Sequence, residues 1–191
     1  GSQTLVGSSA NAFTYELNEG TKAENYTITK TEGTLTVTDR SNKYEITVVA
    51  KSDSVTYNGD PHSVNGFETT TFVVNGQTYT VEGLSASASG TDADVYPSVV
   101  TGVAVVSDAE GHDVTDQFTV NTKNGELTIA KRAVTLKSAD LSKEYDGTAL
   151  ENGETALETE SGWVEGEGAT YTFTGSQTLV GSSANAFTYE L

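Results

Sequence analysis

The chain has 191 residues, of which 35% are hydrophobic, and it carries a net charge of −17 with no cysteine and no methionine. Disulfides and zinc–thiolate sites are excluded because both need cysteine sulfur. Nucleic-acid binding and membrane insertion are not expected, because phosphates and anionic headgroups are repelled and no apolar run approaches about 20 residues.

Short stretches in which polar and apolar residues alternate recur along the chain, which is the pattern of half-buried β-strands. Thr, Val and Tyr dominate these stretches, and no segment has a convincing helical period. In chain order, the predicted strands are residues 26–28, 44–49, 71–74, 78–81, 99–106, 118–120, 126–129 and 171–173. This density of short strands is typical of an immunoglobulin-like fold, so we predict an all-β chain of tandem antiparallel β-sandwich modules.

Asn-Gly and Asp-Gly pairs separate many of these stretches. These residues tolerate positive φ, so each pair is a strong signal for a hairpin or turn. The pairs begin at Asn58, Asn65, Asn75, Asn124, Asp146 and Asn152.

The two ends of the chain are identical in sequence. Residues 1–17 and residues 175–191 both read GSQTLVGSSANAFTYEL. A match of this length does not arise by chance, so it predicts a tandem repeat with a period of 174 residues, from Gly1 to Gly175. The chain then covers one period and the start of the next.

A weaker repeat lies inside this period. Its first part aligns Ile46 with Val134, Tyr57 with Tyr145, and the intervening residues without a gap. The remaining matches are residues 79–83 with 171–175, 90–96 with 181–187, 117–120 with 25–28, and 125–129 with 33–37. Matched residues are expected to share environments, and the two tyrosines are expected to pack over a sandwich edge.

The internal repeat defines two modules. Module A is predicted to be complete, at residues 39–131. Module B is divided: its first half, with the 17-residue overlap, lies at residues 132–191, and its second half at residues 1–38. An open half-sandwich exposes strand edges, so we expect the second half from one chain to complete the first half of the next, end to end.

The motifs of the internal repeat resemble those of MBG and YDG repeat domains. They are Tyr-Asn-Gly at residues 57–59, Tyr-Asp-Gly at 145–147, Tyr-Thr-Val-Glu-Gly at 79–83, and Gly-Glu-Leu-Thr-Ile-Ala-Lys-Arg at 125–132. The similarity covers nearly the whole period. It implies an extracellular β-sandwich stalk of a large bacterial cell-surface or adhesin-like protein, with no catalytic residues.

The residues themselves offer little for catalysis. There is no cysteine, no Gly-x-Ser-x-Gly elbow and no phosphate-binding Gly-rich loop. His62 and His112 lie beside Pro61 and Gly111, where solvated turn histidines are expected. We therefore predict a protein that is not an enzyme and needs no cofactor.

Calcium is the one metal that the sequence leaves open. Asp92 and Asp94 lie in a Gly-Thr-Asp-Ala-Asp stretch, and Asp108 and Asp113 lie in an insert that module B lacks. Carboxylates on loops between sandwich modules can hold Ca²⁺. The alternative is that these carboxylates are simply solvated, and module B has Ser183 and Asn185 at positions matched to Asp92 and Asp94.

Two further residues have alternative readings. Trp163, the only tryptophan, either stacks on a carbohydrate or other ligand, or caps one end of a core. Lys143 aligns with the apolar Val55, so it either joins Asn25 in an isopeptide bond in a complete module B or directs its ammonium group to solvent.

We therefore expect a structural spacer repeat of an extracellular surface or filament protein, whose partners are identical repeats laid end to end. The alternative is an adhesin module that binds a host or matrix ligand through Trp163 or calcium.

Overall fold

A computed structural model of the protein describes residues 1–153 and 157–191; residues 154–156, within the predicted first half of module B, lie outside the described residues. The described chain consists of β-strands, turns and two 3-10 helices of three residues, Ala23–Asn25 and Thr115–Gln117. The all-β prediction is therefore confirmed. Within the described residues, no helix has the length and apolar character that a membrane span requires.

The backbone divides into two compact units, each assembled from three stretches of chain. Unit 1 comprises Gly1–Val48, Thr69–Leu84 and Gly102–Thr122, and unit 2 comprises Val49–Glu68, Ser85–Thr101 and Lys123–Leu191. Residues of predicted module A occur in both units, so its boundaries stay a prediction.

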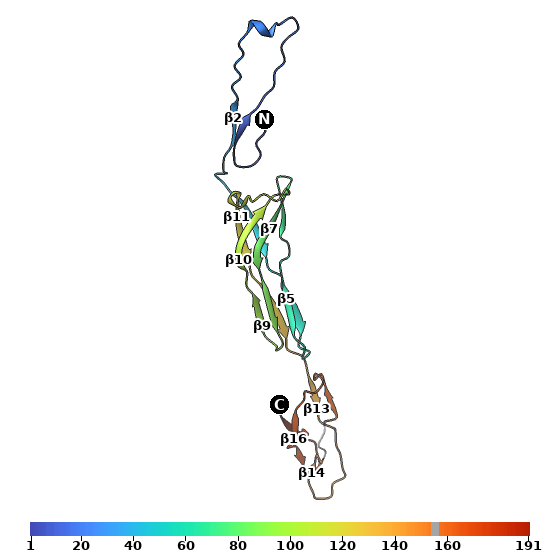
Figure 1. The fold of residues 1–191 in the computed structure, drawn as a ribbon. Coiled ribbons are helices and arrows are strands. Elements are labelled where there is room, and N and C mark those ends of the chain that lie inside the picture. The colour runs from blue at the N-terminus through green and yellow to red at the C-terminus, as the bar shows by residue number, and fades with distance from the viewer. Residues whose placement is uncertain (154–156) are drawn as a thin grey trace. The chain divides into compact units, whose positions relative to one another are not determined.

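Unit 1 begins with an antiparallel pair of strands, β1 (Gly7–Asn11) and β2 (Gly33–Val37), drawn in blue in Figure 1. Ser9 lies opposite Leu35, and the hydroxyl groups of Ser8 and Thr36 are hydrogen-bonded at 3.1 Å. No residue between 1 and 38 is buried. The hairpin therefore has strand pairing but no core of its own.

The remaining strands of unit 1 form two sheets. β7 (Gln77–Ser85) lies between β6 (Thr71–Val74) and β10 (Thr101–Ser107), while β3 (Tyr44–Val49) pairs with β11 (Phe118–Lys123). Asn75 and Gly76 join β6 to β7 with φ angles of 51° and 79°. Both central residues thus have positive φ, so the predicted Asn-Gly hairpin is confirmed at this position.

Aromatic rings organise the core of unit 1. The Phe118 side chain is only 5% exposed, and its ring centroid lies 4.8 Å from that of Tyr79 and 5.6 Å from that of Tyr44. The buried aliphatic residues of this unit are Ile46, Val48, Val81 and Val106.

Unit 2 contains a three-stranded sheet with β12 (Gly125–Ala130) in the middle. β12 runs parallel to β4 (Asp53–Thr56) and antiparallel to β9 (Val95–Ser98). A second pair joins β5 (His62–Asn65) to β8 (Ser87–Gly90). Leu127 and Ile129 of β12 are 0% and 2% exposed, and they pack with Val64, Ala88, Val55, Tyr57 and Tyr96.

Three short strand pairs follow in unit 2. They are β13 (Thr135–Lys137) with β15 (Thr159–Ser161), β14 (Leu150–Glu151) with β17 (Ser176–Gln177), and β16 (Thr170–Phe173) with β18 (Phe187–Glu190). No described residue beyond 131 is buried, and every buried hydrophobic side chain of the described chain lies between Ile46 and Ile129. The residues assigned to module B thus contribute no buried core in this chain.

The strand predicted at residues 26–28 is the first expectation that the structure corrects. Residues 26–28 form no strand, and Tyr26 is 63% exposed although it matches the buried Phe118. Phe118 belongs to β11, which pairs with β3, and the sequence that matches β3 lies at residues 132–137. Residues 26–28 therefore have no equivalent strand to pair with inside unit 1.

The Asn124-Gly125 pair is the second correction, since Gly125 begins β12 instead of forming a turn. The atoms nearest to a Cβ at this position would be the backbone carbonyl oxygens of Ala50 and Lys51. Glycine is present here because the strand enters the sheet against the neighbouring backbone, and not because φ is positive.

Candidate functional site

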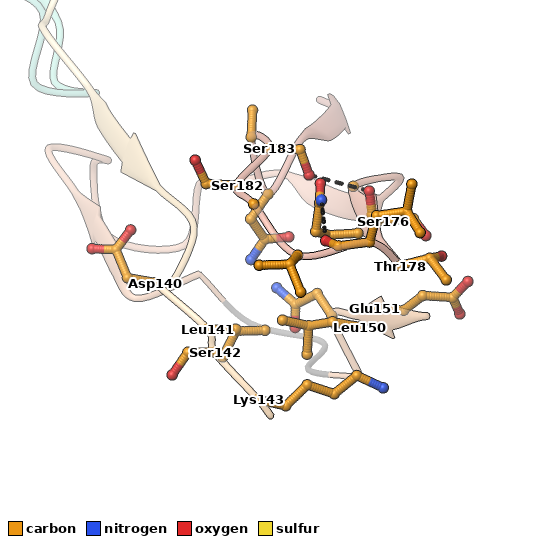
Figure 2. A pocket seen from close by; sticks show the side chains of 18 of the residues that line it. Asp140, Leu141, Ser142, Lys143, Leu150, Glu151, Ser176, Thr178, Ser182 and Ser183 are labelled. Carbon is orange, nitrogen blue, oxygen red and sulfur yellow. Dashed lines mark hydrogen bonds between the residues drawn. The ribbon is translucent and has the colours of Figure 1, made fainter. Parts of the chain in front are cut away.

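A cavity of about 420 Å³ lies in the part of unit 2 that was assigned to module B. It is lined by residues 139–145, 150–152 and 175–185 (Figure 2). Several of its apolar lining residues are exposed to solvent: Leu141, Tyr145, Leu179 and Val180. An open cavity with unburied apolar side chains is a surface suited to a partner.

Lys143 also lines the cavity. Its ammonium group donates to Asp146 Oδ1 at 2.9 Å, Thr148 Oγ1 at 2.6 Å and the Ala149 carbonyl oxygen at 3.2 Å. The hydrogen bond from Lys143 is the main reason that the pKa of Asp146 lies well below its usual range. The charge of Lys143 is thus held in the turn that follows it, and nothing in these contacts bears on an isopeptide bond to Asn25.

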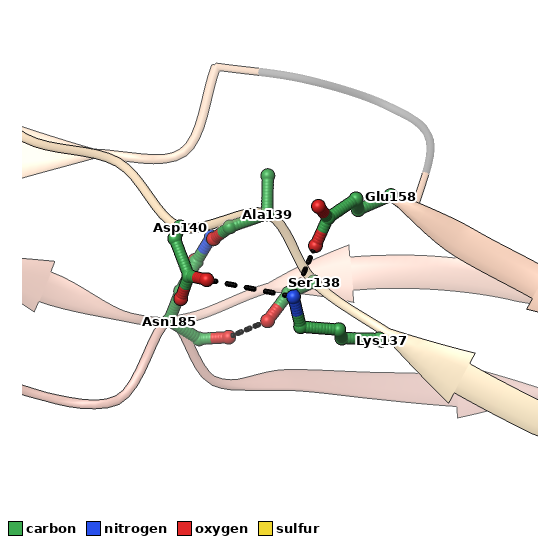
Figure 3. A network of polar contacts seen from close by, with 6 residues as sticks. All are labelled: Lys137, Ser138, Ala139, Asp140, Glu158 and Asn185. Atoms are coloured by element: carbon green, nitrogen blue, oxygen red, sulfur yellow. Dashed lines mark hydrogen bonds and ion pairs between the residues drawn. The ribbon is translucent and has the colours of Figure 1, made fainter.

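Polar contacts join the two walls of the cavity at one end (Figure 3). Ser138 Oγ donates to the Asn185 carbonyl oxygen at 2.7 Å, and Asn185 Nδ2 donates to the Ala139 carbonyl oxygen at 3.0 Å. Lys137 Nζ contacts Glu158 at 2.6 Å and Asp140 at 3.4 Å, and these carboxylates raise its pKa. These hydrogen bonds hold Asn185 next to Ser138 and Ala139 in the isolated chain.

The duplicated sequence folds into the same local loop at both ends of the chain. Gln3 Nε2 donates to the Leu5 carbonyl at 2.8 Å, and Gln177 Nε2 donates to the Leu179 carbonyl at 2.7 Å. The Ser9 hydroxyl group donates to the Ser2 carbonyl oxygen at 3.0 Å, and in the second copy the Ser183 hydroxyl group donates to the Ser176 carbonyl oxygen at 3.1 Å. The loop is therefore determined by its own sequence.

The two copies differ in the strands that they pair with. Residues 7–11 pair with β2, whereas their copy, residues 181–185, forms no strand within the described chain and lines the cavity. Conversely, residues 187–190 pair with β16, whereas their copy, residues 13–16, forms no strand there. Each copy thus has the neighbour that the other copy lacks.

Residues 39–131, the predicted module A, contain a three-stranded ladder whose sequence matches lie at the cavity. In β12, Gly125 lies opposite Ser98 and Leu127 opposite Tyr96 of β9, while Ile129 lies beside Val55 of β4. The sequence matches of β12 and β4 are residues 33–38 and 141–144, and residues 139–145 form one wall of the cavity. The cavity therefore lies beside the segment that matches β4.

The registers of the β1–β2 ladder and of the β9–β12 ladder differ from the alignment of residues 90–96 with residues 181–187. The alignment matches Tyr96 with Phe187, and hence with its copy Phe13, which would place Phe13 opposite Leu35. Instead Ser9 lies opposite Leu35, as Tyr96 lies opposite Leu127. The ladder between β1 and β2 thus differs by four residues from the one that the alignment of residues 90–96 with 181–187 predicts.

Trp163 lines a second cavity, of about 230 Å³, with Tyr57, Arg132, Val134, Val164 and Glu167 among its neighbours. Trp163 is half-buried. The Tyr57 hydroxyl donates to the Glu167 carboxylate, which raises the pKa of Tyr57, and Arg132 Nε donates to the Gly162 carbonyl. Ligand binding by Trp163 stays a prediction.

Asp108 and Asp113, two of the calcium candidates, accept local hydrogen bonds. Asp108 lies within 4.8 Å of Glu110 and His112, measured between their potential ligand atoms, but its Oδ1 accepts hydrogen bonds from the backbone N–H groups of both residues. Asp113 Oδ1 accepts from the Thr115 N–H and hydroxyl groups, at 2.9 and 2.6 Å. These hydrogen bonds lower the pKa of Asp113.

Asp92 and Asp94 contribute to local turns. The Asp92 carbonyl accepts from the Tyr96 hydroxyl at 3.1 Å, and Asp94 Oδ1 accepts from the Val95 N–H at 2.8 Å. Among the described residues, neither aspartate belongs to a group of three potential metal ligands. Calcium binding stays a prediction for all four aspartates.

The histidines likewise take part in local contacts. His62 begins β5, and its Nε2 lies 2.8 Å from Asn58 Oδ1, while His112 Nδ1 lies 3.0 Å from Asp108 Oδ2.

Comparison with protein-family models, with curated proteins and with solved structures gave no match.

Proposed function

We propose that the chain is a repeat of a structural stalk or spacer, in which immunoglobulin-like β-sandwich modules follow one another end to end on a bacterial surface or filament protein. The resemblance to MBG and YDG repeat domains supports this class of protein. The observation that carries the proposal is the distribution of the core: buried hydrophobic residues occur only between Ile46 and Ile129, while the cavity lies outside that range. Module A thus has a core of its own, whereas the first half of module B needs its second half to form one.

An array of such modules fits a spacer because each module needs to contact only its neighbours, so length increases with copy number. A net charge of −17 keeps a long array soluble and resists lateral association. The lack of cysteine and methionine leaves no sulfur to oxidise, which suits an extracellular location.

The test compares proteins that contain one, two and three tandem periods by small-angle X-ray scattering. A spacer is expected to add the same increment to the maximum dimension with every period. A compact globule, whose radius grows only as about the 0.38 power of chain length, would contradict the proposal.

An adhesin module that binds carbohydrate is the second candidate, because Trp163 lines a cavity together with Tyr57 and Arg132. An aromatic face beside a guanidinium group is suited to stacking and hydrogen bonding with a sugar. A glycan array probed with the whole chain and with Trp163→Ala tests this candidate. Binding that is lost in the variant supports it, and no binding by either protein rejects it.

A further inference from the structure

We infer that the cavity between residues 139–145 and residues 181–185 accepts strand β2 of a second copy of this chain. The incoming strand lies antiparallel to residues 181–185, with Val37 opposite Gly181 and Gly33 opposite Asn185, and parallel to residues 139–145. The inference rests on the proposed function and names the partner and the register of its open module.

The antiparallel side follows from the duplicated sequence. Residues 7–11 already pair with β2 in this register, with Gly7 opposite Val37 and Asn11 opposite Gly33. Residues 181–185 have the same sequence, the same loop hydrogen bonds and no strand partner within the described chain. Superimposing one copy on the other therefore places β2 against residues 181–185, which line the cavity.

The parallel side follows from β12. Leu127 lies beside Asp53 and Ile129 beside Val55 in the parallel ladder of module A. Their sequence matches place Leu35 beside Leu141 and Val37 beside Lys143. Both pairs lie on the wall formed by residues 139–145, so one strand satisfies both walls of the cavity at once.

The side chains fit the same placement. In β2, Leu35 and Val37 are half-buried whereas Thr34 and Thr36 are exposed, which matches the alternation in β12, where Leu127 and Ile129 are buried. The cavity offers Leu141 and Tyr145 as exposed apolar surface. A strand with alternate apolar side chains is the partner that such a surface recognises.

Competition between the two identical segments does not prevent this assembly. When β2 leaves residues 7–11 of its own chain and joins residues 181–185 of another, every antiparallel pair is replaced by an identical pair. The parallel ladder and the burial of Leu35 and Val37 are then gained. Such an exchange between identical chains resembles domain swapping and extends head to tail.

A synthetic peptide of residues 18–38 tests the inference, because it contains β2 without the competing residues 7–11. We expect it to bind the full 191-residue chain that carries Leu35→Asn, whose own β2 is weakened as a donor to neighbouring chains, with one-to-one stoichiometry in isothermal titration calorimetry. In the peptide, Leu35→Asn should weaken binding by at least about tenfold, whereas the matched change Thr36→Asn, on the exposed face, should not. No binding, or equal loss with both changes, overturns the inference.

Disulfide trapping tests the register, since the natural chain contains no cysteine. Ser8 faces Thr36 within the chain, so a Thr36→Cys peptide should trap Ser182→Cys and not the adjacent Ser183→Cys. Preferential trapping of Ala186→Cys would instead support the register of the sequence alignment and overturn the one stated here.

A chain extended after Leu191 by a second copy of residues 18–38 provides the control. It should fill its own cavity and stop binding the peptide; continued binding would place the peptide elsewhere and overturn the inference. If the peptide fails to bind while tandem periods still lengthen uniformly in scattering, the strand assignment is wrong and the spacer proposal survives.

Discussion

Tyr57 and Tyr145 occupy matched positions in the two modules, but only Tyr57 packs against a core. Tyr57 contacts the cluster that contains Leu127 and Ile129, whereas Tyr145 is 64% exposed and lines the cavity. Leu127 and Ile129 both come from β12, whose match in module B is β2. The exposure of Tyr145 is therefore explained by the absence of a strand, and not by a difference in its own sequence motif.

The first prediction concerns Tyr145 itself. When the peptide of residues 18–38 is added to the chain, Leu35 and Val37 should cover the Tyr145 ring, and hydroxyl-radical oxidation of this side chain should fall several-fold, because solvent access limits the reaction. Mass spectrometry of the oxidised peptides provides the measurement. Tyr57 is the internal control, and similar protection of both tyrosines would indicate a general effect instead of strand insertion.

The second prediction compares two matched leucines. Leu127→Ala should lower the free energy of unfolding by about 2–5 kcal/mol, because it leaves a cavity beside Ile129 in the buried cluster of unit 2. Leu35→Ala should cost less than about 1 kcal/mol in the isolated chain, because Leu35 is only half-buried. Urea denaturation measures both values.

Equal losses in the two variants would mean that the residues 1–38 contribute as much core as β12. In the chain extended after Leu191 by residues 18–38, the same leucine of the added copy should become as costly to truncate as Leu127. A small effect there as well would contradict the assignment of β2 to the cavity.

Sequence alternation predicted the strands that contain large apolar residues. β3 and β12 fall on predicted stretches, because their buried residues are isoleucine, valine and leucine separated by polar residues. One strand that escaped prediction, β8, buries only a small side chain. Ser87–Gly90 contributes Ala88 to the core, and a Ser-Ala alternation has too little apolar character to be recognised as a strand by itself.

The sequence predicted where the candidate site lies, but not the register in which the strands beside it pair. The 17-residue duplication predicts that module B is divided and that its strand edges are open. The position of Ser9 opposite Leu35 depends on a ladder between residues far apart in sequence, and matching glycines at 90 and 181 gave a register that differs by four residues. Pairing between distant strands is decided by which side chains fit across the ladder, which an ungapped comparison does not contain.

The third prediction is the acid titration of Asp146. Hydrogen bonds from Lys143 and Thr148 favour its charged form, so its pKa in the folded chain lies below the ordinary value of 3.8. The stabilisation of the turn is therefore complete above the unfolded-state pKa and is lost as the pH falls through the lower folded-state pKa. Lys143→Gln should raise the carboxyl pKa of Asp146, which NMR titration can follow.

Asp113 is the control in the same spectra. Its pKa is lowered by Thr115 and not by a lysine, so Lys143→Gln should leave it unchanged. An Asp146 pKa that is the same in the natural chain and the variant would show that the Lys143 contact does not persist in solution.

The fourth prediction concerns Gly33 and its match Gly125. A Cβ at position 125 would overlap the backbone of Lys51, so Gly125→Ala should cost about 1–3 kcal/mol or more, whereas the nearest atom to a Cβ at position 33 is Asn11 Cβ at 4.0 Å. Gly33→Ala should therefore hardly change the free energy of unfolding of the isolated chain, which urea denaturation measures.

The same substitution in the peptide tests the inserted strand. In an inserted β2, however, Gly33 enters between Ala139 and Asn185 when the hydrogen bond between these two residues opens, as Gly125 enters beside Lys51. The Gly33→Ala peptide should accordingly bind at least about tenfold more weakly than the natural peptide in calorimetry, and unchanged affinity would show that the strand does not pass through this gap.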